Sequence, residues 1–274
     1  MFGIPSIEKT VFHNDFINNV IVSGSFSNNR SCTEQRQSLK ERFAEMLPIQ
    51  TDQPQQQYKI NIDVKTNQTS IDANVDEKER QVTLRSRNMQ KELNLTNSTF
   101  HYRENGMIYG TASTFDNAVK PAFDYLTEVG VEQLNTFQLR KTNAVGFEMK
   151  ANDGGGPVQP WQTTVNLLNP RLVPQFQAMF ETATMIKQHI RNMQLTDGDY
   201  TLIINYGFAV TERVVDGSSV NGQVILDLEI IRKAPILSNE IIGELEKLHQ
   251  ELYNAFRWCI SDAYVELLNQ EGGR

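Results

Sequence analysis

Alternation of apolar and polar residues along several short runs is the feature that most constrains how this chain can fold. In YKINIDVKT (58–66) every second residue from Tyr58 to Val64 is apolar, which places one apolar face along an extended backbone. The same period of two recurs in the segments 68–77, 80–88, 98–104, 199–215 and 221–233. Turn sequences such as TDGD (196–199) separate the runs. Alternating runs joined by turns predict antiparallel strands, and their apolar face needs a cover.

The segment SNEIIGELEKLHQELYNAFRWCISDAYVELL (238–268) can supply such a cover. Its apolar residues recur at the spacing of three and four that is typical of an amphipathic helix, at Ile241, Leu245, Leu248, Leu252, Ala255, Cys259, Ala263 and Leu267. We expect one continuous helix of about 45 Å, with Ser238 as its N-cap. Packing on the chain's own sheet is favoured for the stripe, and a homodimer formed through it is the alternative.

The remaining elements complete an α+β fold. We expect strands at 16–26, 133–150 and 179–193 and helices at 32–47 and 113–128, with TDQPQQQ (51–57) as a polar connector. Together these elements predict two antiparallel β-meanders, each closed by a helix, with the long C-terminal helix packed on the second sheet. We place the boundary between an N-terminal half (1–131) and a C-terminal half (132–274).

Composition narrows the function classes. The 274 residues carry a net charge of −7, and acidic residues outnumber basic ones in both halves. A surface dedicated to nucleic acid is therefore not expected. No run approaches the ~18 apolar residues of a membrane span, and no signal peptide is evident, so we expect a cytoplasmic protein without membrane contact. Cys32 and Cys259 predict a reduced, structural pair of thiols.

Motifs for catalysis or metal binding are absent from the sequence. The histidines (His13, His101, His189 and His249) are scattered, and no CxxC pair, Walker loop or nucleophile elbow occurs. We therefore expect no catalytic constellation, no metal and no cofactor. The glycine cluster NDGGGPVQPW (152–161) runs into prolines, which favours a flexible loop over a phosphate-binding site. Trp161 at its end is a candidate partner-binding residue, because tryptophan is enriched at interfaces.

Two further groups of charged residues suggest weaker hypotheses. Asp227 and Glu229 share one face of a strand and, with a histidine, could serve a metal-dependent hydrolase, although a solvated face is favoured. A second hypothesis is a basic and aromatic patch formed by Arg85, Arg87, Tyr102 and Arg103. Such a patch could bind single-stranded nucleic acid, but nearby acidic residues argue against this function.

The segment FQLRKTNAVGFEMK (137–150) contains an interruption in its alternation. Its odd-numbered face is apolar at both ends, but Lys141 and Asn143 lie in the middle. We expect the Asn143 amide to bind nearby backbone where the strand bends or bulges. The Lys141 ammonium must reach water, a carboxylate or a ligand, because an unpaired buried charge is too costly. Arg140, on the opposite face, completes the candidate binding residues of this segment.

Three stretches of the chain resemble a known bacterial family. They are the opening segment SIEKTVFHNDFINNVIVSGSF, the central VEQLNTFQLRKTNAVGF, and the late VILDLEII with the terminal ELEKLHQELYNAFRWCISDAYVELL. In this order they resemble the sporadically distributed TIGR04255 family over nearly the whole length. The positions that match its motifs are Leu139, Arg140, Asn143, Leu226, Asp227, Leu248, His249 and Phe256. At Lys141 the family prefers an aromatic residue. The resemblance implies one whole-chain unit and no particular activity.

Three functions follow in order of preference. The first is a non-enzymatic adaptor or regulatory protein that binds a protein partner, since the scaffold is large and lacks catalytic motifs; sporadic families of this kind are associated with mobile or defence-related operons. The second is a small-molecule binder with a cavity between a curved sheet and the terminal helix, in which Lys141 and Asn143 would orient the ligand. The third is the hydrolase described above.

Overall fold

The structure, a computed structural model, describes residues 1–10, 12, 14, 16–63, 68–106, 111–150, 160–173, 188–213 and 219–270. Within the strands and one helix, only the backbone is described at 55–63, 68–79, 149–150, 160–161, 211–213 and 219–220.

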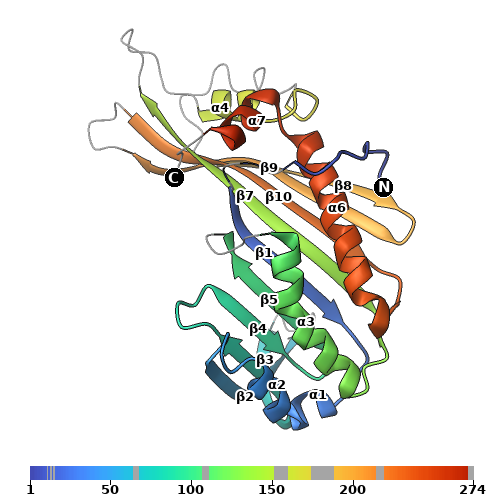
Figure 1. Cartoon of the computed structure of the whole chain (residues 1–274). Coiled ribbons are helices and arrows are strands. Elements are labelled where there is room, and N and C mark those ends of the chain that lie inside the picture. The colour runs from blue at the N-terminus through green and yellow to red at the C-terminus, as the bar shows by residue number, and fades with distance from the viewer. Residues whose placement is uncertain are drawn as a thin grey trace.

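One large antiparallel sheet dominates the fold. Its nine strands lie in the order β2-β3-β4-β5-β1-β7-β10-β9-β8, and every neighbouring pair is antiparallel (Figure 1). The strands are β1 (Ile17–Ser25), β2 (Ile49–Asp63), β3 (Gln68–Arg85), β4 (Lys91–Leu95), β5 (Thr99–Asn105), β7 (Thr136–Lys150), β8 (Gln188–Asp197), β9 (Tyr200–Arg213) and β10 (Ser219–Arg232). A small second sheet pairs β6 (Gln133–Leu134) with β11 (Ile236–Leu237).

The two halves of the chain meet at the pair formed by β1 and β7. Ser25 lies opposite Thr136 and Ile17 opposite Asn143, so β1 and the first long strand of the C-terminal half lie side by side in the middle of the sheet. The sequence predicted two sheets, but this pairing joins the strands of both halves into one. The α+β class and the antiparallel pairing are confirmed. The division at residue 131 stays a prediction.

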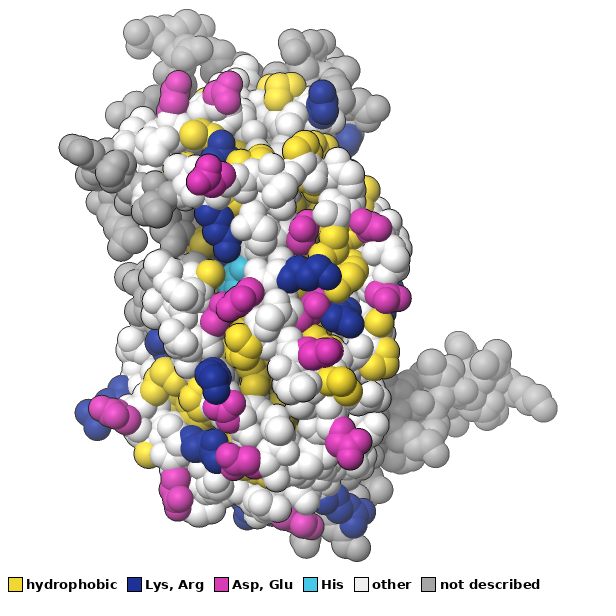
Figure 2. Space-filling model, turned by 45° about the vertical axis from the view of Figure 1, so that its right-hand side comes forward, with side chains coloured by type: hydrophobic (Ala, Val, Ile, Leu, Met, Phe, Trp, Pro, Cys, Tyr) yellow, Lys and Arg dark blue, Asp and Glu magenta, His cyan; other side chains and the backbone are white. Residues whose placement is uncertain are grey.

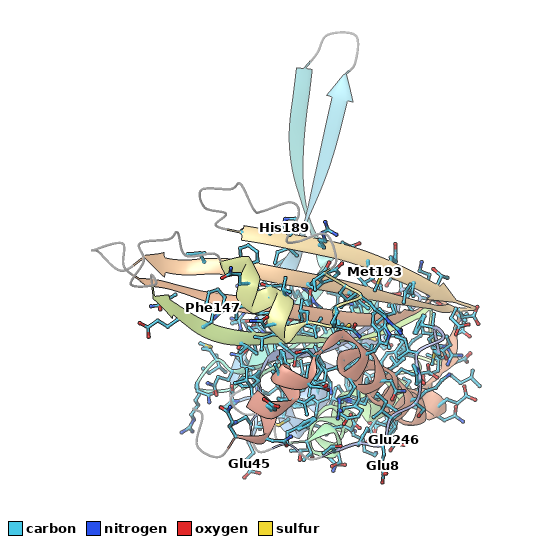
Figure 3. The ribbon with its side chains drawn as sticks, turned by 90° about the horizontal axis from the view of Figure 1, so that it is seen from above. Glu8, Glu45, Phe147, His189, Met193 and Glu246 are labelled. Atoms are coloured by element: carbon cyan, nitrogen blue, oxygen red, sulfur yellow. The ribbon has the colours of Figure 1, made fainter. Side chains whose placement is uncertain are left out.

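The helices gather on one face of the sheet. They are α1 (Ser31–Glu34), α2 (Arg36–Arg42), α3 (Ala112–Glu128), α4 (Pro160–Leu167), the 3₁₀ turn η2 (Ser238–Glu240), α6 (Ile241–Cys259) and α7 (Asp262–Asn269). Figure 1 shows α3 in front of the strands of the first half and α6 in front of those of the second. The hairpin of β2 and β3 extends from the body on the side away from these helices (Figure 3).

Apolar residues of α6 form the cover that the sequence predicted. The helix contacts α3, β7 and β10. The part of the predicted stripe that lies in α6 is buried, at Ile241, Leu245, Leu248, Leu252, Ala255 and Cys259, whereas Ala263 of α7 is exposed and Leu267 is half-buried. The alternating strands supply the other side of this core through residues such as Leu226, Leu228 and Ile230. Cys32 and Cys259 are both buried thiols without a disulfide, as expected, and burial raises the pKa of Cys32 to about 12.

Five expectations differ from the structure. The runs 68–77 and 80–88, expected as separate strands, form the single strand β3. The terminal helix is broken, because Ile260 is extended and the Ser261 hydroxyl accepts a hydrogen bond from the Tyr264 amide, so α7 has its own N-cap. Ser238 caps no helix; its hydroxyl donates to the Val131 carbonyl. The region 32–47 holds two short helices instead of one, and the expected connector at 51–57 belongs to β2.

The part of the expected strand 179–193 that precedes residue 188 lies outside the described residues. None of the described helices is long and apolar enough to cross a membrane.

Candidate functional site

A cavity of about 310 Å³ lies between α6 and the centre of the sheet. Its walls come from the segment before β1, from β7 and β10, from the start of α3, from α6, and from the end of α7. The lining includes Phe12 from the segment before β1, Lys141 from β7 and Leu228 from β10. Thr111 lines it at the start of α3, His249 from α6 and Leu268 from α7. Figure 2 shows the helical face, where a histidine side chain (cyan) is visible among hydrophobic, basic and acidic side chains. The site therefore forms where the two halves meet.

The alternation of β7 places Lys141 and Asn143 in this cavity. Phe137, Leu139 and Val145 point into the core on the same face of the strand, and Lys141 and Asn143 follow the same parity and line the cavity. The interruption in the sequence pattern thus marks the place where the core gives way to a cavity. Lys141 is half-buried.

Asn143 has the structural role that the sequence predicted. The residue is 5% exposed, and its Nδ2 donates to the carbonyl oxygen of Leu226 on β10 at 3.3 Å. The pairing of β1 with β7 shifts register between Ile17 and Asn19, directly beside Asn143. The predicted bulge is therefore present, but β1 carries it and β7 does not. The amide of Asn143 fixes the floor of the cavity next to Lys141.

His249 forms part of the wall contributed by α6. Its Nε2 lies 2.9 Å from Oδ1 of Asp116 on α3, and its ring packs edge-on against Phe115. Burial lowers the pKa of His249 to about 4; the positive charge of Lys141 acts in the same direction, and the Asp116 hydrogen bond opposes both. At neutral pH the ring is therefore uncharged, Nε2 carries the proton that Asp116 accepts, and Nδ1 is an acceptor. Nδ1 is buried and has no hydrogen-bond partner among the described residues.

Aromatic and aliphatic side chains make up much of the remaining wall. Phe16 and Phe256 each pack edge-on against Tyr264, with ring centroids 5.9 and 5.7 Å apart. Leu252 and Leu268 are buried beside them. This arrangement gives the cavity a largely apolar surface with a few polar groups, which is typical of small-molecule sites.

Asn14 holds the segment before β1 over the cavity. Its side-chain Nδ2 donates to the carbonyl oxygens of Leu267 at 3.0 Å and Gln270 at 2.6 Å. Its backbone amide donates to Leu268 at 2.9 Å. Three hydrogen bonds thus tie this segment to the end of α7, and both elements line the cavity.

Arg140, the third candidate on this strand, lies on the opposite face of the sheet. Its guanidinium forms a bidentate ion pair with Asp227, with Nε–Oδ1 and Nη2–Oδ2 distances of 2.8 and 2.7 Å. Thr142 and Asn205 also donate to this carboxylate. The structure therefore does not bring Arg140 together with Lys141 and Asn143. A stabilising ion pair accounts for Arg140.

The residues of the hydrolase hypothesis do not form a metal site in the part of the chain that is described. Asp227 is 6% exposed and paired with Arg140, so the expectation of a solvated face is wrong for this residue. Burial raises the pKa of Glu229, although the nearby charge of Arg140 lowers it. The described residues contain no group of three His, Cys, Asp or Glu side chains arranged to hold a metal ion. Trp161 is the second residue of α4, and its side chain lies outside the described part.

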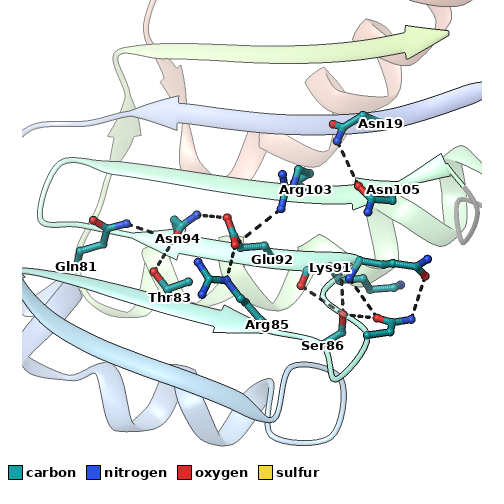
Figure 4. A network of polar contacts seen from close by, with 12 residues as sticks. Asn19, Gln81, Thr83, Arg85, Ser86, Lys91, Glu92, Asn94, Arg103 and Asn105 are labelled. Carbon is teal, nitrogen blue, oxygen red and sulfur yellow. Dashed lines mark hydrogen bonds and ion pairs between the residues drawn. The ribbon is translucent and has the colours of Figure 1, made fainter. Parts of the chain in front are cut away.

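The hypothetical basic patch is divided between the two faces of the sheet. Arg85 and Arg103 both approach the same oxygen of Glu92, at 2.5 and 3.8 Å, in a network that includes Asn94 (Figure 4). Although burial alone would raise the pKa of Glu92, these donors hold it below its usual value. Tyr102 is fully buried and donates to Glu104, so its ring does not join the arginines.

The sequence did not predict several residues that line the cavity or support its wall. They are Lys9, Asn14, Thr111, Asp116 and Phe256. No model of a known protein family matches this chain, and no curated protein matches it significantly.

Proposed function

We propose that this protein binds a small, mostly apolar molecule in the cavity between α6 and the sheet. The observation that carries this proposal is the cavity itself, whose volume of about 310 Å³ lies at the lower end of the range for ligand pockets. The two β-meanders, each closed by its helix, would then serve as a frame, and the ligand would bind where they meet.

Packing around the cavity supports this proposal. Protein interiors usually fill such a space with side chains, but here half-buried Lys141 replaces an apolar residue on the inner face of β7. A polar group at such a position weakens the core unless it serves another purpose. Orientation of a ligand is such a purpose. Resemblance to the TIGR04255 family would be compatible with this function and adds no activity to it.

Blocking the cavity tests the proposal. Ala112, the first residue of α3, is half-buried and lines the cavity, whereas its neighbour Ser113 is exposed. Octanamide, an uncharged probe with an eight-carbon chain, and its charged analogues octanoate and octylammonium are titrated calorimetrically into the full chain. We expect binding to the wild type and to Ser113→Trp, and at least a tenfold loss with Ala112→Trp. Failure of all three probes to bind at millimolar concentration would overturn the proposal.

A protein partner, a homodimer and a role in a defence-related operon stay predictions. The apolar stripe of α6 is buried within the chain, so a dimer would have to use another surface. The hydrolase also stays a prediction, and the geometry of its carboxylates lends it no support.

A further inference from the structure

We infer that the ligand of this cavity is a small acid: an apolar body that carries a single anionic group, bound next to Lys141. This inference rests on the proposed function and adds the chemical class of the ligand. It is drawn from the charges that line the cavity, from their position relative to the apolar walls, and from the size of the space.

Among the described residues that line the cavity, the two charged side chains are both lysines. Lys9 and Lys141 line the cavity, and none of the described residues that line it is Asp or Glu. This excess of positive charge contrasts with the net charge of −7 for the whole chain. A basic cavity in an acidic protein favours an anion at this site and disfavours a cation.

The state of His249 is consistent with a positive field inside the cavity. After burial, the charge of Lys141 is the largest cause that lowers the pKa of His249, and Lys9 adds to it. Asp116 is the acidic residue that opposes them, and its carboxylate is bound to Nε2 of the same ring. The imidazole is therefore neutral at neutral pH, and the lysines supply the charge that an anion would meet.

Lys141 shares the cavity wall with apolar side chains from the strands and from the helices, such as Leu228 and Leu252. Lys141 and Asn143 come from β7 on the sheet side. Phe256 and Leu268 come from α6 and α7 on the helix side. An acidic group at Lys141 would therefore leave the rest of the molecule against apolar side chains. Because the site is partly shielded from water, one charge pair contributes more there than at the surface.

The small volume limits the ligand further. About 310 Å³ accommodates a short fatty acid or a small aromatic acid and is too small to enclose a nucleotide coenzyme or a long lipid. Asn143 and Thr111 add uncharged polar groups to the same cavity wall.

Three probes with the same chain and different charge test this inference. Octanoate, octanamide and octylammonium are anionic, neutral and cationic at neutral pH, and the first two have nearly the same shape. We expect octanoate to bind about tenfold more tightly than octanamide, and octylammonium to bind most weakly. Equal or tighter binding of octanamide would overturn the inference and leave the proposed function standing. Binding of none of the three would overturn the function itself.

A matched pair of variants assigns the preference to Lys141. Lys141→Met keeps the length of the side chain and removes its charge, and we expect it to bring the affinities for octanoate and octanamide within about threefold of each other. Lys120→Met is the control, since Lys120 lies on the exposed side of α3 and pairs with Asp124; it should keep the tenfold preference. A preference for octanoate that persists in Lys141→Met would show that another residue holds the anion and would contradict the assignment.

Discussion

Nε2 of His249 on α6 lies 2.9 Å from Oδ1 of Asp116 on α3, and this contact links the helices of the two halves beside the cavity. The His249 side chain is 1% exposed and that of Asp116 is 12% exposed. The pair therefore has a structural role, and it holds an imidazole that is neutral at neutral pH in the cavity wall.

The free energy of unfolding should decrease as the pH is lowered, because of His249. Burial lowers its pKa from 6.5 to about 4 in the folded protein, so the unfolded chain binds a proton at a higher pH than the folded one. The contribution is present above about pH 6.5 and is lost as the pH falls toward 4, with a total loss of about 3 kcal/mol. Urea unfolding between pH 7 and pH 4 measures this loss.

His249→Gln is the comparison for that experiment, because Gln can still donate to Asp116 and does not titrate. We expect its stability to depend less steeply on pH than that of the wild type. An NMR titration of the imidazole provides a direct check. A midpoint at or above 6.5 would contradict the buried, neutral state.

The ion pair between Arg140 and Asp227 should stabilise the protein. Arg140→Met removes the ion pair of the nearly buried Asp227 carboxylate and leaves it the donors Thr142 and Asn205, which should reduce the free energy of unfolding by about 1–3 kcal/mol. The double variant with Asp227→Asn should lose less than the sum of the two single variants. Strictly additive losses would argue against direct coupling.

The same Arg140 variant also tests the division of the strand into two faces. Because Arg140 lies on the face away from the cavity, Arg140→Met should bind octanoate within about twofold of the wild-type affinity. A large loss of affinity without a matching loss of stability would place Arg140 in the binding site after all.

Ser261 should stabilise the start of α7. Its hydroxyl accepts from the Tyr264 amide at 3.3 Å and donates to the Asn166 carbonyl oxygen at 2.6 Å. Ser261→Ala removes both bonds, and we expect a loss of about 1–2 kcal/mol in thermal or urea unfolding. Ser27→Ala, at an exposed position, should change stability by less than about 0.5 kcal/mol. Equal effects of the two changes would argue against the cap.

Gly207 should not tolerate a side chain. Its φ is +152°, and a Cβ atom there would lie 1.9 Å from the carbonyl oxygen of His189 on β8. We expect Gly207→Ala to cost more than about 2 kcal/mol. Gly146→Ala is the matched control in β7, since nothing lies within 4 Å of its Cβ position. Urea unfolding under the same conditions measures the free energy of unfolding of each variant. Similar losses in the two variants would contradict the close approach of β8 and β9 at Gly207.

Local pattern determined much of the secondary structure. Alternation predicted β9 and β10 nearly to their ends, and the 3–4 spacing predicted α3 and the buried face of α6, because both periods follow from backbone geometry. Lys141 and Asn143 stood out for the same reason, as polar residues on an otherwise apolar face. The break at Ile260 escaped prediction, because the apolar stripe continues across it. Contacts with a distant segment divide the helix: the Asn169 amide donates to the Cys259 carbonyl oxygen, and the Ser261 hydroxyl donates to that of Asn166.

Periodicity shows which face of an element is buried, but it does not show what covers that face. The pairing of β1 with β7 and the contact between Asp116 and His249 bring together residues that are far apart in the chain. The separation of Arg140 from Lys141 places neighbouring residues on opposite faces of one strand. These relationships depend on how the elements pack together. Periodicity therefore indicated most of the strands, the buried helical faces and the unusual position of Lys141, whereas the packing of the elements decided that Lys141 lines a cavity.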